Sequence, residues 1–238
     1  MKINFPLLAL AVGAFAIGTT EFSPMGFLPE IANDLSVSIP QAGLLISAYA
    51  VGVMIGAPLM TLWLARFPKK TALILLMAIF TIGNVLATVA PDYMSLMGAR
   101  LITSLNHGAF FGLGSVVAAS VVPKDKQASA VAMMFMGLTI ANIGGVPLAT
   151  WLSQNTSWRM AFAAISILGI MTMLALWKAL PQDHDVVKPN VAKGLRVLTR
   201  APVVLALLTT VMSAGAMFAL YTYIAPSLHV FMQASPQT

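Results

Sequence analysis

Long apolar runs, separated by short polar connections, make up most of the chain. They cover residues 5–27, 41–64, 71–90, 95–120, 128–152, 159–179 and 202–226. A helix needs about 20 apolar residues to cross the hydrocarbon core of a bilayer, and each run has about that length. Strands of a membrane β-barrel would alternate apolar and polar side chains over about 10 residues, and no run does so. The pattern predicts an all-α membrane protein with seven spans.

Composition supports this class. Hydrophobic residues make up 59% of the chain and charged residues only 8%, against about 25% charged in an average soluble domain. There are no cysteines, which excludes disulfide and thiolate sites, and His107, His184 and His229 lack metal-ligand spacing, so we expect no cofactor or metal. The first run follows Lys2 like a secretory signal, but no A-x-A-like cleavage site follows it, which favours an uncleaved span.

The basic residues predict the orientation of the chain. Of the 13 Lys and Arg residues, eleven fall on one side of the predicted spans. Because cytoplasmic loops are enriched in Lys and Arg, we expect the N-terminus to be cytoplasmic. The opposite connections carry Glu30, Asp34 and Asp92. The net charge of +6 is thereby explained by topology, and a nucleic-acid partner is not expected; the lipid bilayer is.

Connection lengths predict the domain organisation. The first six spans are joined by short connections, which indicates one six-helix bundle at residues 1–180. A polar, basic linker at 181–200 follows, and 201–238 then contain a single further span. That span is interpreted as the first element of a second bundle whose remainder is missing.

Glu21 is the only charged residue between Lys2 and Glu30, in a segment where a charge costs at least ~2.5 kcal/mol. It lies roughly 9 Å from the outer end of the first span, and Arg100 lies roughly 8 Å from the outer end of the fourth, at 1.5 Å per residue. The shared depth predicts a direct or water-bridged pair in a polar cavity. The alternative is that each side chain reaches the interface separately.

His107 follows Arg100 by two helical turns and should share its face. An imidazole near the bilayer midplane is able to titrate or bind substrate, or else to hydrogen-bond a neighbouring helix without changing charge. Tyr49 is a further candidate for the cavity wall, although such residues more often serve packing.

Small residues mark close helix contacts and a weak helix. The pairs Gly52/Gly56 and Gly108/Gly112 have the small-xxx-small spacing of close-packed helices. In the fifth span, Gly144, Gly145 and Pro147 weaken the backbone ladder. This segment either kinks for packing or lines a cavity, with Asn142 as a polar contact.

Several motifs together resemble the major facilitator superfamily, in its twelve-span drug:proton antiporter branch near the arabinose-efflux-permease-like transporters. The matching stretches are "GTTEFSPMGFLPEIA", "ARLITSLNHGAFFGLG", "GLTIANIGGVPLATWL", "SWRMAF" and "LYTYIAPSL". The resemblance implies a bacterial inner-membrane protein with two six-helix bundles, each of two inverted three-helix repeats, and substrate bound between them. Glu21 and Arg100 would then serve proton coupling and substrate recognition, with His107 facing the same cavity. The antiporter motif of the fifth span would map to Gly137, Gly144, Gly145 and Pro147.

The chain departs from this family in two places. In the loop after the second span, "TLWLARFPKK", Arg66, Lys69 and Lys70 of the gating motif remain, but its aspartate and glycines do not. Topology alone would select those basic residues. The chain also ends after the seventh span, so it is expected to be either a truncated, non-transporting product or a chain that needs a partner supplying the second half.

The function predicted on this basis is secondary active transport of a small drug-like or sugar-like molecule, by efflux in exchange for protons, with symport as the nearest variant. A seven-helix receptor or retinal protein is disfavoured, because the N-terminus is predicted to be cytoplasmic and residues 201–238 contain no lysine for a Schiff base. An enzyme is not expected, since the spans lack residues at catalytic or metal-binding spacing.

Overall fold

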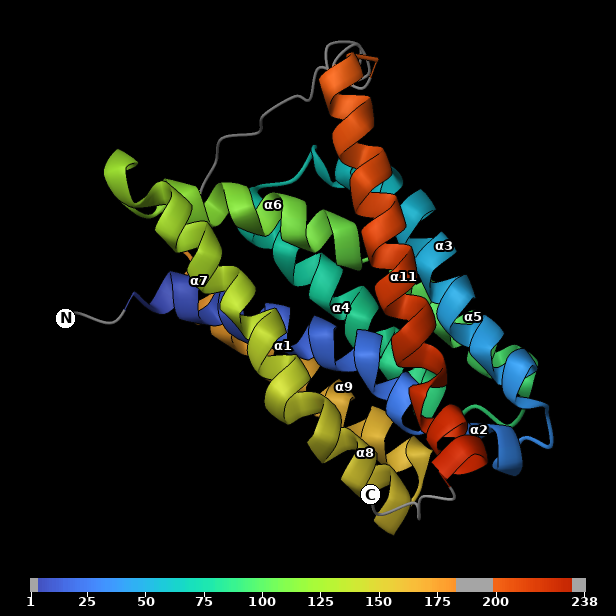
Figure 1. Cartoon of the computed structure of the whole chain (residues 1–238). Coiled ribbons are helices and arrows are strands. Elements are labelled where there is room, and N and C mark those ends of the chain that lie inside the picture. The colour runs from blue at the N-terminus through green and yellow to red at the C-terminus, as the bar shows by residue number, and fades with distance from the viewer. Residues whose placement is uncertain (1–3, 183–198, 233–238) are drawn as a thin grey trace. The chain divides into compact units, whose positions relative to one another are not determined.

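The computed structural model describes residues 4–182 and 199–232. Its elements are α1 (Phe5–Gly26), α2 (Leu28–Asp34), α3 (Ile39–Leu64), α4 (Lys69–Thr88), α5 (Tyr93–Ser104), α6 (His107–Ser120), η1 (Lys124–Lys126), α7 (Gln127–Ile140), η2 (Ala141–Gly145), α8 (Val146–Asn155), α9 (Trp158–Ala179) and α11 (Ala201–Met232). Within the described residues, seven segments are long and apolar enough to cross a membrane. The predicted all-α fold with seven spans is confirmed (Figure 1).

Polar residues in the connections set the points where several spans begin. Asn4, Ser38, Asp92 and Ser157 each accept a hydrogen bond from a backbone N–H in the first turn of the following helix. Such caps satisfy donors that have no partner inside the helix. The short polar connections seen in the sequence therefore both end one span and start the next.

Helix α1 is the central element of the six-span unit and packs against α7, α8 and α9, while α4 packs along α9 and α3 along α5 and α6 (Figure 1). Three of the four glycines with small-xxx-small spacing lie at close contacts between helices. A Cβ at Gly52 would meet Ser104, one at Gly56 would meet the backbone of Leu105, and one at Gly108 would meet Ala57. Gly112 has no such neighbour within 4 Å.

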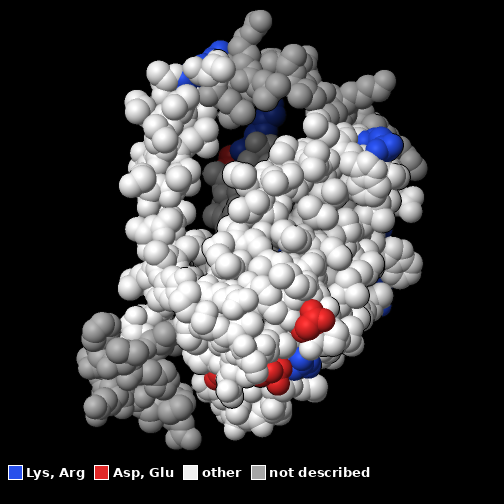
Figure 2. Space-filling model, turned by 90° about the vertical axis from the view of Figure 1, so that its right-hand side faces the viewer, with Lys and Arg blue, Asp and Glu red and all other residues white. Residues whose placement is uncertain are grey.

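The outer surface is apolar. Large hydrophobic side chains such as Met54, Ile143 and Ile167 are more than half exposed. Figure 2 shows one face that is almost free of charge, with Lys, Arg, Asp and Glu confined mostly to its ends. An uncharged band between charged ends fits a protein surrounded by lipid.

Two spans are not continuous α-helices. The fourth is interrupted at Leu105 and Asn106, whose N–H groups bond to carbonyls three residues back at 3.3 and 3.4 Å. The fifth contains the π-helical segment η2, in which the Val146 N–H bonds to the Ala141 carbonyl, five residues back. Since Pro147 has no N–H to donate, the change of register occurs where the sequence predicted a weak backbone ladder.

The chain divides into two compact units, residues 1–186 and 187–238. In the second unit, α11 is a 32-residue helix that contains the seventh span. Most of the predicted linker, 181–200, lies at 183–198, outside the described residues. The functional division into a bundle and an incomplete second half stays a prediction.

Candidate functional site

Four polar side chains predicted from the sequence come together between α1, α3, α5 and α6. Glu21 Oε2 lies 3.8 Å from His107 Nε2, and the other ring nitrogen of His107, Nδ1, lies 3.1 Å from the Tyr49 hydroxyl. The guanidinium carbon of Arg100 lies 4.2 Å from the centre of the Tyr49 ring. Glu21, Tyr49, Arg100 and His107 therefore form one contiguous group, hereafter the polar cluster.

A backbone carbonyl of α1 that lacks its usual hydrogen-bond donor holds Arg100 in place. Its Nη1 donates a hydrogen bond of 2.9 Å to the carbonyl of Thr20. That carbonyl would normally accept from the residue four positions later, but Pro24 stands there, inside α1, and has no N–H. Arg100 thus supplies the hydrogen bond that Pro24 removes, one residue before Glu21.

Aromatic rings cover the rest of the Arg100 head group. Tyr49 and Phe162, from α3 and α9, both lie within 6 Å of its guanidinium carbon, a distance at which ring faces attract cations. Arg100 is only 1% exposed, and its Nε and Nη2 have no hydrogen-bond partner among the described protein atoms. Its positive charge acts on the cluster through space and is not presented on a surface.

The pairing of Glu21 with Arg100 stays a prediction. The hydrogen bond of Arg100 goes to the Thr20 carbonyl, and the Glu21 carboxylate lies against His107. Glu21 and His107 side chains are each 14% exposed. The carboxylate and the imidazole are therefore the members of the cluster with access to the surroundings.

The fifth-span motif packs against α1 and does not join the polar cluster directly. A Cβ at Gly137 would meet the backbone of Ala11, and one at Gly145 would meet Thr19 and Phe15. Gly144 has nothing within 4 Å. Asn142 Nδ2 donates to the Leu138 carbonyl of its own span at 3.0 Å. Pro147 follows the π-helical segment, on an exposed face.

The basic residues after the second span also lie outside the cluster. Arg66 Nε donates to the carbonyl of Trp63 at 2.8 Å, and its guanidinium lies 5.6 Å from the Trp63 ring centre. Lys70 Nζ donates at 2.8 Å to the carbonyl of Leu180, just after the end of α9. Both contacts are made to carbonyls near helix ends, and a role of these residues in gating stays a prediction. Lys69, between them, starts α4.

Sequence reasoning missed three features of the site. Pro24 stands four residues after Thr20 and cannot donate to the Thr20 carbonyl. This signal would have indicated that carbonyl as a hydrogen-bond acceptor for Arg100. The break at Asn106 had no Gly or Pro to signal it, and the Asn106 amide is fully buried without a hydrogen-bond partner among the described atoms. The contact with Phe162 joins the fourth and sixth spans, which no local pattern predicts.

Comparison with known proteins defines the class that this all-helical, multi-span fold belongs to. The family model described as Major Facilitator Superfamily matches residues 10–236. The chain belongs to this superfamily.

Individual proteins agree with this assignment. The chain is 66% identical over 236 residues to the inner membrane transport protein YdhP of Escherichia coli (strain K12), covering 99% of this chain and 61% of YdhP. It is 42% identical to the uncharacterised MFS-type transporter YtbD of Bacillus subtilis (strain 168), covering 95% of this chain and 58% of YtbD. The chain thus spans about three fifths of the length of these relatives.

A solved structure has the same fold. The inward-facing, unoccupied crystal structure of a bacterial homologue of the human lysosomal transporter Spinster superposes with a TM-score of 0.78 at 18% identity. The superposition covers 98% of this chain and 56% of the Spinster homologue.

Proposed function

We propose that this chain provides the proton-binding half of a secondary transporter in the bacterial inner membrane, which exports a small molecule in exchange for protons. Membership of the Major Facilitator Superfamily and similarity to YdhP and YtbD, which are both named as transporters, support membrane transport. The observation that carries proton coupling is the contact between Glu21 and His107, 3.8 Å apart at membrane depth.

Glu21 is the group proposed to take up and release the proton. Its carboxylate lies in the first span, where an uncompensated charge is costly. Glu21 is therefore stable there either protonated or ionised beside a positive charge. Arg100, fixed by Thr20 and two aromatic rings, provides a constant positive charge that favours the ionised form. A change of access or substrate occupancy that alters this balance would move the proton on or off Glu21.

His107 and Tyr49 are proposed to act on that proton. If the Tyr49 hydroxyl donates to Nδ1, the neutral imidazole carries its own proton on Nε2, which points at Glu21. In this arrangement Tyr49 sets the tautomer of His107, and His107 donates towards the carboxylate. Alternating access of the complete transporter would then expose the Glu21–His107 pair to each side of the membrane in turn.

Infrared difference spectroscopy of the purified chain tests proton binding directly. We expect a carboxylic-acid C=O band that changes in intensity with pH, is lost in Glu21→Gln and is kept in Asp125→Asn, which removes an exposed acidic group. His107→Gln should shift this band, because it alters the neighbour 3.8 Å away. A pH-dependent band that is unchanged in Glu21→Gln would refute the role of Glu21.

A further inference from the structure

Helix α9 presents one apolar stripe to its surroundings. The side chains that recur there every three or four residues, each with about half of its surface exposed or more, are Ile167, Ile170, Leu174 and Trp177. This spacing places them on one face of the helix, and in a protein surrounded by lipid such a face contacts acyl chains. The stripe ends at Trp177, a ring type that is enriched where the hydrocarbon core meets the lipid head groups.

Two lysines from different helices lie where this stripe ends. Lys178 follows Trp177 directly and is exposed. Lys70 is in the first turn of α4, which packs along α9, and its Nζ donates at 2.8 Å to the carbonyl of Leu180, just after the end of α9. A lysine ammonium has three donors, so this bond holds the Lys70 ammonium at the end of α9 and leaves donors for a further acceptor. Lys70 and Lys178 are hereafter the lysine pair.

The charge around the lysine pair is positive. Neither lysine has an ion-pair partner among the described residues, and Asp125 is the only acidic residue described on the predicted cytoplasmic side. The linker at 181–200 carries two Asp and four Lys or Arg, which adds net positive charge. Since the cytoplasmic leaflet of a membrane is negatively charged, basic pockets between spans on this side attract anionic head groups.

We propose that the lysine pair binds the phosphodiester head group of an anionic phospholipid, with one acyl chain along the stripe of α9 and Trp177 against the glycerol region. A zwitterionic lipid is disfavoured, because its amine brings a further positive charge to two ammonium groups. A free phosphate is disfavoured as well, because it makes no contact with the apolar stripe. The site lies at the ends of α4 and α9 and contains no residue of the polar cluster, so it is independent of the proposed proton binding.

Native mass spectrometry of the purified chain in detergent, with increasing amounts of each probe, tests this assignment. The probes are dioleoyl phosphatidylglycerol (anionic), dioleoyl phosphatidylethanolamine (zwitterionic, with the same chains) and sodium phosphate (no chains). We expect phosphatidylglycerol to bind at least about fivefold more tightly than phosphatidylethanolamine, since they differ by one charge beside the lysine pair, and phosphate to bind more weakly than either lipid. Equal affinity for the two lipids, or phosphate binding as tight as that of phosphatidylglycerol, would overturn the assignment.

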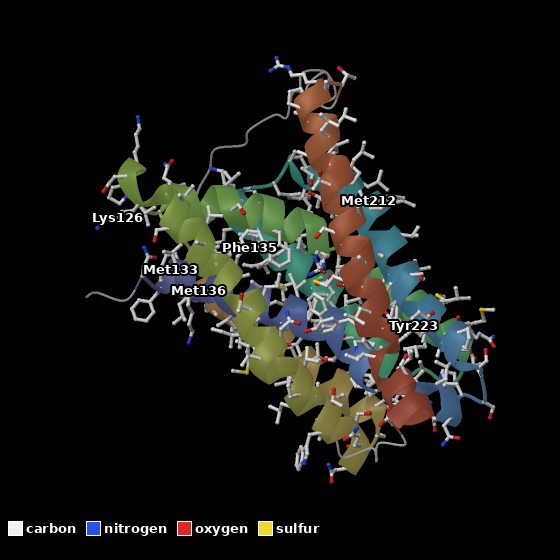
Figure 3. The ribbon with its side chains drawn as sticks, in the orientation of Figure 1. Lys126, Met133, Phe135, Met136, Met212 and Tyr223 are labelled. Atoms are coloured by element: carbon white, nitrogen blue, oxygen red, sulfur yellow. The ribbon has the colours of Figure 1, made fainter. Side chains whose placement is uncertain are left out.

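Substitutions of single lysines show whether binding depends on this site or on net charge. Lys178→Gln should weaken phosphatidylglycerol binding about threefold to fivefold, and Lys178→Arg should retain it. Lys126→Gln should leave it unchanged, because Lys126 is an equally charged, exposed lysine of the same predicted side that lies on η1, at the start of α7 (Figure 3). An equal loss of affinity in Lys178→Gln and Lys126→Gln, or no loss in Lys178→Gln, would contradict the site.

Tryptophan fluorescence in bilayers locates the bound lipid. Lipids with brominated acyl chains quench the indoles that they contact, and we expect stronger quenching by brominated phosphatidylglycerol than by brominated phosphatidylethanolamine. Trp177→Phe should remove this difference, whereas Trp151→Phe should keep it. Trp151 is 59% exposed, as Trp177 is, but lies on α8 at the opposite end of the spans. A difference that persists in full in Trp177→Phe would show that the anionic lipid binds elsewhere.

Discussion

At the scale of single residues, backbone groups decide where the charged side chains go. Pro24 removes the hydrogen-bond donor of the Thr20 carbonyl, and Arg100 replaces it. The sequence predicted that Glu21 and Arg100 share a depth, since depth follows from position along each span. It did not predict the partner of Arg100, because a carbonyl is present at every residue and only the proline four positions on distinguishes this one.

A second group of interactions joins the short helix α2 to the ends of two spans, α4 and α9. Asp34, the last residue of α2, accepts hydrogen bonds from the Arg159 guanidinium and, at 3.0 Å, from the Trp158 indole. Arg159 also donates to the carbonyl of Ala90 at 2.9 Å and lies over the Trp158 ring. Asp34 thereby connects the ends of α2, α4 and α9.

This contact predicts a pH-dependent contribution to stability. The hydrogen bond from Arg159, followed by that from Trp158, holds the pKa of Asp34 below its usual value. A depressed pKa in the folded state gives stability that is present above the unfolded pKa of about 3.9 and is lost as pH falls through the folded value. Asp34→Asn should therefore cost roughly 0.5–1 kcal/mol at pH 7, a small value because Asp34 is half exposed.

Thermal unfolding of the purified chain at two pH values measures the effect. The gap in unfolding midpoint between wild type and Asp34→Asn should be present at pH 7 and narrow as the pH falls below the usual pKa of an aspartate, where the Asp34 carboxylate becomes protonated. An equal gap at both pH values would show that charge on Asp34 does not contribute.

At the scale of elements, the sequence predicted the helices well and their irregularities unevenly. Spans follow from apolar length, which is a local property, and all seven were found within the described residues. In the fifth span, Gly145 and Pro147 signalled weakened backbone hydrogen bonding, and the structure has the π-helical segment η2 there. The break at Asn106 was not signalled, because neither Leu105 nor Asn106 is a Gly or Pro and the close approach of Gly56 to the Leu105 backbone joins two different spans.

Two glycines of the same motif allow a matched test of packing between α7 and α1. A Cβ at Gly137 would lie 2.9 Å from backbone atoms of Ala11 and Phe15, which cannot rotate away. Gly137→Ala should therefore destabilise the chain by roughly 1–3 kcal/mol. Gly144→Ala meets nothing within 4 Å and should be neutral or stabilise by up to about 1 kcal/mol.

Denaturant or thermal unfolding in the same detergent compares the two variants. Equal stability of Gly137→Ala and Gly144→Ala would contradict close packing of α7 on α1, since both substitutions have the same intrinsic helix preference.

At the scale of the whole molecule, a carboxylate within a span couples transport to protons only if it is accessible to protons from each side of the membrane in turn. The six-span unit places Glu21, His107 and Tyr49 in one line of contacts, and superfamily members move two bundles about such a central site. This chain spans 61% of YdhP. Transport is therefore best measured with this chain extended by the C-terminal remainder of YdhP.

Solute flux in vesicles containing that extended protein tests proton coupling most directly. For a solute that the unmodified protein accumulates when a pH gradient is imposed, Glu21→Gln should abolish accumulation but keep exchange of labelled for unlabelled solute, because Gln keeps the size and shape of the side chain and removes only the group that binds the proton. Asp125→Asn should behave as the unmodified protein. Accumulation driven by the pH gradient at an unchanged rate in Glu21→Gln would contradict the account.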